Sequence, residues 1–114
     1  MTAHSVFMTV QWQITPGEAR PITEALHALM VAAQTERGYV NCSLSTELGE
    51  LARLVYREEW QTEEHLQYQI RTARFARVAG LIEASSRPPK VQFHLQGAVR
   101  GLEYAEELLR RERT

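Results

Sequence analysis

The order in which strand-like and helix-like segments follow one another constrains the fold of this chain more than any single motif. Residues 5–14 alternate between apolar and polar side chains, which predicts a strand with an apolar face made by Val6, Met8, Val10, Trp12 and Ile14. The same alternation predicts strands at residues 39–47, 52–60 and 90–97. After the first strand, apolar residues recur at three- and four-residue steps, which predicts a helix with Pro21 in its first turn and Gly38 at its C-terminal end.

A second helical region follows the third predicted strand. Thr62 and the acidic residues after it are typical of a helix N-terminus. Two apolar stripes follow that do not join at 3.6 residues per turn: Leu66, Ile70 and Ala73, then Phe75, Val78, Ala79 and Ile82. We therefore predict a break near Arg71-Thr72. A last stripe predicts a C-terminal helix at about residues 101–112, with Leu102, Ala105, Leu108 and Leu109 on its apolar face.

The predicted order is β-α-β-β-α-β with an extra C-terminal helix, which is the split βαβ arrangement of the ferredoxin-like α+β folds. We expect a single domain over residues 1–114, with its core at about 5–97. An antiparallel sheet with helices on one face leaves its other face uncovered. Two such sheets packed face to face would cover both, so the pattern favours a homodimer.

Composition and charge exclude several classes of function. A formal net charge of −1 argues against nucleic-acid binding, which needs a basic face. No apolar run approaches the roughly 20 residues that cross a bilayer, so no membrane partner is expected. The single cysteine, Cys42, cannot form an internal disulfide and is expected to be a buried free thiol, which favours the cytoplasm. The histidines form no i, i+4 pair and no cluster with Cys42, so we expect no metal site.

Two titratable residues are candidates for proton transfer. Glu58 shares a strand face with Trp60, and a carboxylate in a half-apolar cavity would have a raised pKa and could act as a base. The alternative is a structural ion pair between Glu58 and a nearby arginine such as Arg71. His94 alternates out of phase with Phe93, and it becomes a candidate if its face of the strand looks into the pocket. A structural histidine is the alternative there.

Several short motifs, in this order and spacing, resemble one known family. They are Pro16-Gly17, Glu36-Arg37-Gly38, Tyr56-x-Glu58-x-Trp60, Phe75 and Pro88-Pro89-x-Val91. Together they resemble the antibiotic biosynthesis monooxygenase domain over residues 5–97. The resemblance implies a dimeric α+β barrel. It also implies a small monooxygenase that oxidises an aromatic phenol or quinol with O2 and uses no metal or flavin cofactor.

The resemblance assigns roles to individual residues. It implies a pocket with Trp60, Tyr56 and Phe75 as walls, although Trp60 could equally fill the core. Many members carry a histidine nine residues after the tryptophan, and this chain has Gln69 there, which can orient a substrate but cannot relay a proton. Gln69 or Arg71 would face the substrate oxygen, with His94 or Glu58 as the base. Arg71 and Arg74 could stabilise a phenolate or quinone oxygen, and surface arginines explain them equally well.

The resemblance also gives reasons against a role for His65 and against haem degradation. His65 lies four residues before Gln69, points in a different direction on its helix and is predicted to be exposed. The haem-degrading members need an asparagine on the first strand, and residues 6–13, VFMTVQWQ, contain none, so haem degradation is not expected.

Two further hypotheses belong to other classes of protein. The first is a non-catalytic homodimer that binds a small aromatic molecule or scaffolds a pathway, which the glutamine at position 69 favours. The second is a protein-interaction module that uses the C-terminal stripe of Leu102, Leu108 and Leu109.

Overall fold

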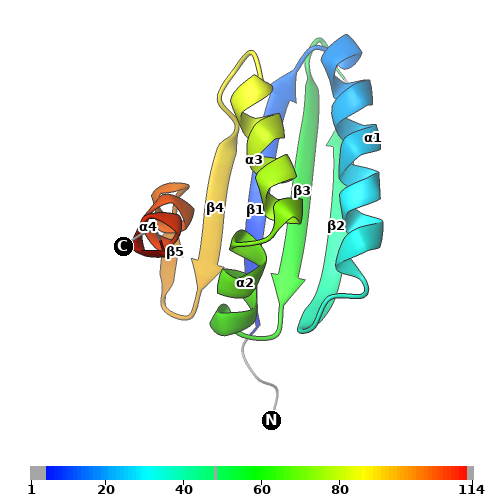
Figure 1. Ribbon diagram of the computed structural model, residues 1–114. Helices are drawn as coiled ribbons and strands as arrows, with labels where there is room; N and C mark the ends of the chain where they lie inside the picture. Colours follow the sequence, from blue (N-terminus) through cyan, green and yellow to red (C-terminus); the bar gives the residue numbers. More distant parts are fainter. Residues whose placement is uncertain (1–4, 48, 113–114) are drawn as a thin grey trace.

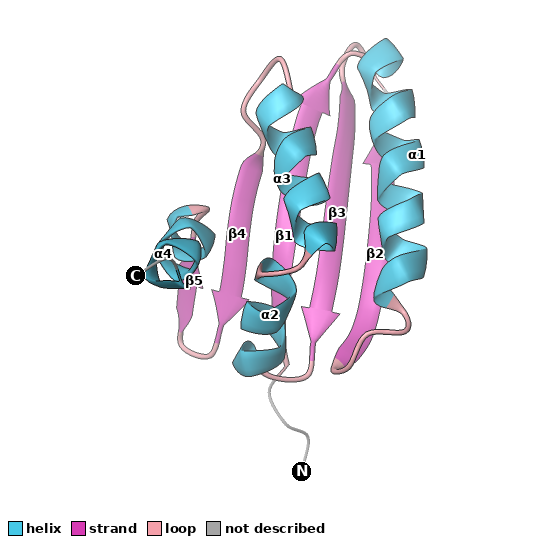
Figure 2. Cartoon of the chain, viewed as in Figure 1, coloured by secondary structure: helices cyan, strands magenta, loops and turns pink. Residues whose placement is uncertain are grey.

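The computed structural model describes residues 5–47 and 49–112. Within them the strands are β1 (Val6–Ile14), β2 (Tyr39–Glu47), β3 (Ala52–Trp60), β4 (Lys90–Leu95) and β5 (Ala98–Arg100). The helices are α1 (Pro16–Ala33), α2 (Glu63–Ile70), α3 (Ala73–Ala84) and α4 (Glu103–Glu112). The strands form one antiparallel sheet in the order β2-β3-β1-β4-β5, and α1, α2 and α3 lie against one face of it (Figures 1 and 2). This is the predicted ferredoxin-like α+β fold.

The central strand β1 places the core between the sheet and the helices. Its apolar parity, from Val6 to Ile14, is almost fully buried, as the alternation predicts. Met8 lies opposite Glu58 of β3 and Phe93 of β4, so these three residues share the helix-covered face of the sheet. The registry therefore brings a carboxylate into the apolar interior.

Helix α1 begins earlier than the position of Pro21 predicts. The Thr15 hydroxyl accepts a hydrogen bond from the Glu18 N–H at 3.4 Å, and the Glu18 carboxylate accepts one from the Thr15 N–H at 3.2 Å. This capping box starts the helix at Pro16 and leaves Pro21 inside it. The missing N–H of Pro21 frees the carbonyl of Gly17, a residue exposed to water, so the helix tolerates the proline.

The predicted break in the second helical region is confirmed. Helix α2 ends at Ile70 and α3 begins at Ala73, with Arg71 and Thr72 as the intervening caps. The Thr72 hydroxyl accepts the Phe75 N–H at 3.3 Å and so starts a second helix with a new phase. Leu66 and Ile70 of the first stripe and Phe75 and Val78 of the second are then buried, whereas Ala73 is exposed.

The C-terminal part of the chain differs from the prediction in one element. The fourth strand stops at Leu95, and Gly97, with φ of 76°, turns the chain into the short strand β5. The pattern of residues did not predict this strand of three residues. Helix α4 follows, with Tyr104 and Leu108 buried against the chain's own core. The Tyr104 hydroxyl donates to Glu63 of α2 at 2.7 Å. The stripe proposed as an interaction surface is therefore packed on this domain.

The opposite face of the sheet carries no helix among the described residues (Figure 1). Its half-buried side chains include Phe7, Arg57 and His94. Pairing of this face with a second copy of the chain stays a prediction. Within the described ranges, no helix has both the length and the apolar character to cross a membrane.

Candidate functional site

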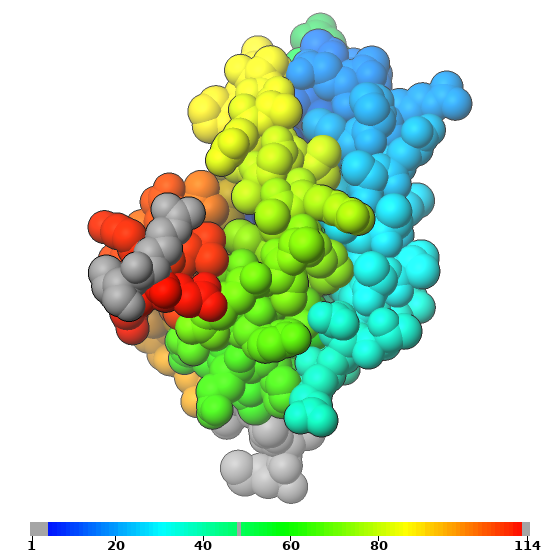
Figure 3. All heavy atoms as spheres, viewed as in Figure 1, coloured from blue at the N-terminus to red at the C-terminus, as the bar shows by residue number. Residues whose placement is uncertain are grey.

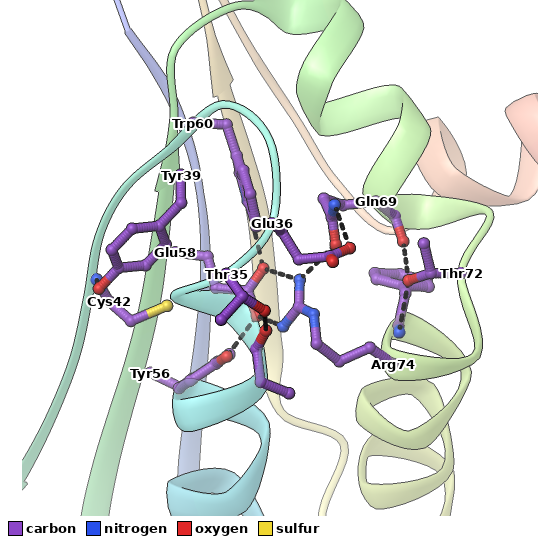
Figure 4. Close-up of polar contacts among 12 residues, drawn as sticks. Thr35, Glu36, Tyr39, Cys42, Tyr56, Glu58, Trp60, Gln69, Thr72 and Arg74 are labelled. Carbon is purple, nitrogen blue, oxygen red and sulfur yellow. Dashed lines mark hydrogen bonds and ion pairs between the residues drawn. The ribbon is translucent and has the colours of Figure 1, made fainter.

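A buried carboxylate, Glu58, is the centre of the candidate site (Figure 4). Its Oε2 accepts hydrogen bonds from the Tyr56 hydroxyl and from Nη1 of Arg74. Its Oε1 accepts from Trp60 Nε1 at 3.2 Å and from Nη2 of Arg74 at 3.0 Å. A carboxylate offers about four acceptor positions, so these four contacts use its whole capacity.

Local sequence explains how the cluster assembles. The two-residue period of β3 places Tyr56, Glu58 and Trp60 on one face, directed at the helices. The helix break then turns Arg74 back toward the sheet, where its guanidinium lies 5.4 Å from the Trp60 ring. Arg74 is only 9% exposed, and a charge that is so buried needs the partner that Glu58 provides.

The cluster extends from the core to the turn between α1 and β2. Arg74 Nη2 also donates to Oε1 of Gln69 at 3.0 Å, and Gln69 Nε2 donates to Oε1 of Glu36 at 2.9 Å. Gln69 is 1% exposed, whereas Glu36 is half-buried. Among the described residues, Nε of Arg74 is a buried nitrogen without a hydrogen-bond partner. The result is a continuous chain of polar contacts, Glu36–Gln69–Arg74–Glu58, in which the Nε–H of Arg74 donates to no acceptor in the described part of the chain.

The protonation states follow from burial and from the Glu58 charge. Burial first, and the nearby Glu58 carboxylate second, raise the pKa of the Tyr56 hydroxyl. The same two causes raise the pKa of the Cys42 thiol to about 12. Burial alone would lower the pKa of Arg74, but its hydrogen bonds to Glu58 and the Glu58 charge outweigh burial and raise it. At neutral pH the cluster therefore holds a cationic arginine, a protonated tyrosine and a protonated thiol.

The structure brings together most of the residues that the sequence singled out. Trp60, Tyr56, Glu58 and Gln69 belong to the cluster, and Phe75 is buried on α3. Arg71 does not join them.

Arg71 is instead bound at the surface. Its Nε lies 3.4 Å from a carboxylate oxygen of Glu112 on α4. The ion pair expected as the alternative role of Glu58 is present, but its arginine is Arg74 and not Arg71. The phase of α3, which Thr72 resets, decides between the two arginines.

His94 lies on the other side of the sheet from Glu58. It is paired with Phe7 of β1, and its ring stacks on the Phe7 ring at a centroid distance of 4.4 Å. The guanidinium of Arg57 lies 4.0 Å from the centroid of the same Phe7 ring. Partial burial, and then the Arg57 charge, lower the pKa of His94. Because the sheet separates them, His94 and Glu58 cannot act on one molecule bound within a single chain.

His65 was expected to be exposed, but it is half-buried against the α1–β2 turn. A Cβ on Gly38 would lie 2.3 Å from Cγ of His65, and Gly38 has φ of 85°, so only glycine fits there. The ring nitrogen Nδ1 of His65 lies 2.8 Å from the Thr62 hydroxyl.

The same two segments enclose a hollow of about 530 Å³ at the surface. It is lined by Glu36, Arg37, Glu64, His65 and Tyr68. Sequence reasoning missed Glu36 as a site residue. The available signal was its position in the sequence, two residues before Gly38, whose backbone has φ of 85°.

No protein-family model matches the sequence, and no curated protein sequence matches it. Solved structures do resemble it. A Nitrosomonas europaea protein, named as a candidate antibiotic biosynthesis monooxygenase, superposes with a TM-score of 0.68 at 15% identity, over 89% of this chain and 92% of that one. The chain shares its fold.

Two further structures give the same result. One from Deinococcus radiodurans, also named as a candidate antibiotic biosynthesis monooxygenase, has a TM-score of 0.67 at 12% identity, over 78% of this chain and 89% of that one. PA3566 from Pseudomonas aeruginosa has a TM-score of 0.67 at 19% identity, over 83% of this chain and 96% of that one. The ferredoxin-like α+β fold predicted for this chain is thus shared with structures that carry the family's name.

Proposed function

We propose that the protein is a monooxygenase that oxidises a small aromatic phenol or quinol with O2 and uses no metal or flavin. The observation that carries the proposal is the buried Arg74–Glu58 pair with Tyr56 and Trp60 beside it, between sheet and helices. Likeness to structures from Nitrosomonas europaea and Deinococcus radiodurans that are named as candidate antibiotic biosynthesis monooxygenases supports it.

The proposed chemistry divides between the substrate and the pocket. A phenol with a free para carbon loses two hydrogens and gains one oxygen atom, and the second atom of O2 leaves as water. Phenolates react with O2 more readily than phenols, so the protein must stabilise an anion and remove a proton. Arg74 is the cation for the phenolate oxygen, and Glu58 is the acceptor for the proton.

The closed cluster sets a condition for this reaction. Glu58 has no free acceptor position while Tyr56, Trp60 and both Arg74 nitrogens donate to it. A substrate must therefore displace at least one of these donors. Arg74 is the donor that can be displaced, because the oxygen anion of the substrate could take the place of Glu58 as its partner. His94 lies on the other sheet face and has no part in this site.

Oxygen uptake by the purified protein, with metals and flavins removed, tests the proposal. Uptake above the autoxidation rate with a phenol or quinol, reduced at least about tenfold in Arg74→Met, supports it. Trp60→Ala should also abolish uptake if this ring forms the pocket wall. Absence of uptake with every substrate, from a folded protein, would refute the proposal.

A second candidate function rests on the saturation of Glu58 and on Gln69. A carboxylate with four donors and a glutamine that cannot relay protons describe a binding site better than an acid–base site. The protein would then be a non-catalytic homodimer that binds a small aromatic molecule or acts as a scaffold. Oxygen uptake by Gln69→His, absent from the native chain, would favour this candidate.

Both candidates include a homodimer formed through the face of the sheet that carries Phe7 and Arg57. Covering this face would remove the half-buried Phe7 ring from water. Sedimentation of the native chain against Phe7→Glu tests the pairing, since a charge at this position would keep two copies apart. We place the working protein in the cytoplasm, where an unpaired Cys42 stays reduced.

A further inference from the structure

The hollow of about 530 Å³ has the chemistry of a ligand site. The α1–β2 turn contributes Glu36 and Arg37, and α2 contributes Glu64, His65 and Tyr68. These two segments meet on the face of the molecule shown in Figure 3. Tyr68 is 61% exposed, which is unusual for so large a ring and provides an aromatic wall. His65 is held in place by Thr62 and by its contact with Gly38, so its side of the hollow is preformed.

The hollow is connected to the buried cluster by one residue. Glu36 lines the hollow, and its Oε1 accepts the hydrogen bond from Gln69, which in turn accepts from Arg74. Among the described residues, Gln69 is the hydrogen-bond partner of the Glu36 carboxylate. Behind this contact, the buried Nε of Arg74 has a hydrogen to donate and no acceptor. A buried donor of this kind is rare in native proteins.

The charges around the hollow select among aromatic compounds. Glu36 and Glu64 are negative and Arg37 is positive, so carboxylates outnumber guanidinium groups in the lining. A carboxylated ring would be repelled, and an uncharged ring with a hydroxyl could donate to Glu36.

We propose that this hollow is the outer subsite for an uncharged aromatic alcohol, and that Glu36 is a positioning residue that holds Gln69 and Arg74 in place for it. The inference rests on the proposed function only in taking Arg74 as the group that meets the ligand. Binding places the ring against Tyr68 and the hydroxyl at Glu36. The hydrogen bond from Gln69 to Glu36 then connects binding in the hollow to Arg74.

Nuclear magnetic resonance titrations of the full chain under argon, with phenol and with 4-hydroxybenzoate as probes, test this inference without turnover. Phenol should shift the amide signals of Arg37, His65 and Tyr68 and the Nε–H signal of Arg74. The benzoate should bind about threefold or more weakly, because surface charge pairs of this kind contribute up to about a factor of five.

Three variants separate a ligand site from a structural contact. Tyr68→Ala should weaken phenol binding about three- to tenfold, and Val31→Ala, a truncation at another exposed apolar side chain on α1, should leave it unchanged. Glu36→Gln keeps an acceptor for Gln69 and should remove the discrimination against 4-hydroxybenzoate. Glu36→Ala removes the acceptor and should move the Arg74 Nε–H signal without any ligand.

Two results would overturn the inference. The first is that a saturating concentration of phenol leaves the amide signals of Arg37, His65 and Tyr68 unmoved. The second is that Tyr68→Ala binds phenol as tightly as the native chain does. These failures are distinguishable from failure of the proposed function. Oxygen uptake with an unchanged KM in Tyr68→Ala would remove the subsite and leave the oxygenase. Binding of phenol at the hollow by a protein that shows no oxygen uptake would leave the subsite and remove the oxygenase.

Discussion

The two faces of the sheet each carry an arginine beside an aromatic ring, and the two pairs behave differently. On the helix-covered face, Arg74 lies 5.4 Å from the Trp60 ring, and its side chain is 9% exposed. On the open face, Arg57 lies 4.0 Å from the Phe7 ring, and its side chain is 38% exposed. The closer pair is the more exposed one.

Burial, rather than the distance between arginine and ring, decides what each pair contributes. Arg74 requires Glu58 because a buried charge without a partner is costly, and Glu58 in turn requires Tyr56 and Trp60 as donors. Arg57 reaches Glu59 at only 3.9 Å and is screened by water. One face therefore holds a locked network, and the other holds an adaptable surface.

The largest effect is expected from removing the buried negative charge. Glu58→Gln leaves Arg74 charged and without a counter-ion, and should lower the free energy of unfolding by about 3–5 kcal/mol. The matched variant Glu59→Gln, on the adjacent position of the other face, should cost less than about 1 kcal/mol. Urea denaturation of both measures the difference, and a cost under about 1 kcal/mol for Glu58→Gln would contradict a locked network.

The reactivity of Cys42 reports whether the network stays closed. Burial and the Glu58 charge raise the pKa of this thiol to about 12, so almost no thiolate exists at pH 8. Its reaction with an aromatic disulfide reagent should be at least about a hundredfold slower in the folded chain than in urea. Glu58→Gln removes the second cause of the shift and should accelerate the reaction. A folded-state rate close to that in urea would show that the cluster opens readily.

Replacing each arginine by lysine sharpens the comparison further. Arg74→Lys cannot reproduce two parallel hydrogen bonds to Glu58 together with the contact to Gln69, and should cost about 1–3 kcal/mol. Arg57→Lys keeps the exposed charge and should cost less than about 0.5 kcal/mol. Thermal unfolding of the two variants checks the ratio, and equal losses would remove the distinction between the faces.

The smallest effect is expected from titrating His94 on the open face. Its pKa lies below the ordinary value of 6.5 because of partial burial and the Arg57 charge. The folded state therefore prefers the neutral ring, and this contribution is full above about pH 6.5 and is lost as the pH falls below that value. The loss should stay under about 1 kcal/mol, because the site is partly hydrated.

The variant His94→Phe provides the control for this titration, since its ring can still stack on Phe7 but cannot gain a proton. It should flatten the fall in stability between pH 7.5 and pH 5. An identical pH profile for the variant and the native chain would assign the dependence to other groups.

The fold was largely readable from local patterns. Period-two alternation gave β1, β2 and β3 nearly to their ends, because one face of each strand is packed on a core and the other is not. Two apolar stripes that do not join at 3.6 residues per turn located the break at Arg71 and Thr72. The apolar period placed Pro21 in the first turn of α1, whereas a capping box starts the helix at Pro16. The strand β5 was missed because its three residues, two exposed and one half-buried, are too few to carry a periodic signal.

The site was readable only in part. Strand alternation alone placed Tyr56, Glu58 and Trp60 together, and their contacts follow from it. The same alternation put His94 on one of two faces without telling which one the helices cover. The sequence favoured Arg71 over Arg74 as the partner of Glu58, because a helix break makes the direction of the next turn depend on its cap.

The sequence by itself determined the element order, the parity of each strand and the presence of one carboxylate in an apolar row. These properties depend on neighbours along the chain, which the sequence records directly. Only the tertiary structure decided that Arg74 meets Glu58, that His94 faces away from them and that Glu36 completes the chain of contacts. Each of those outcomes joins segments 16 to 87 residues apart, and their relative placement follows from sheet registry and helix phase, which no local pattern encodes.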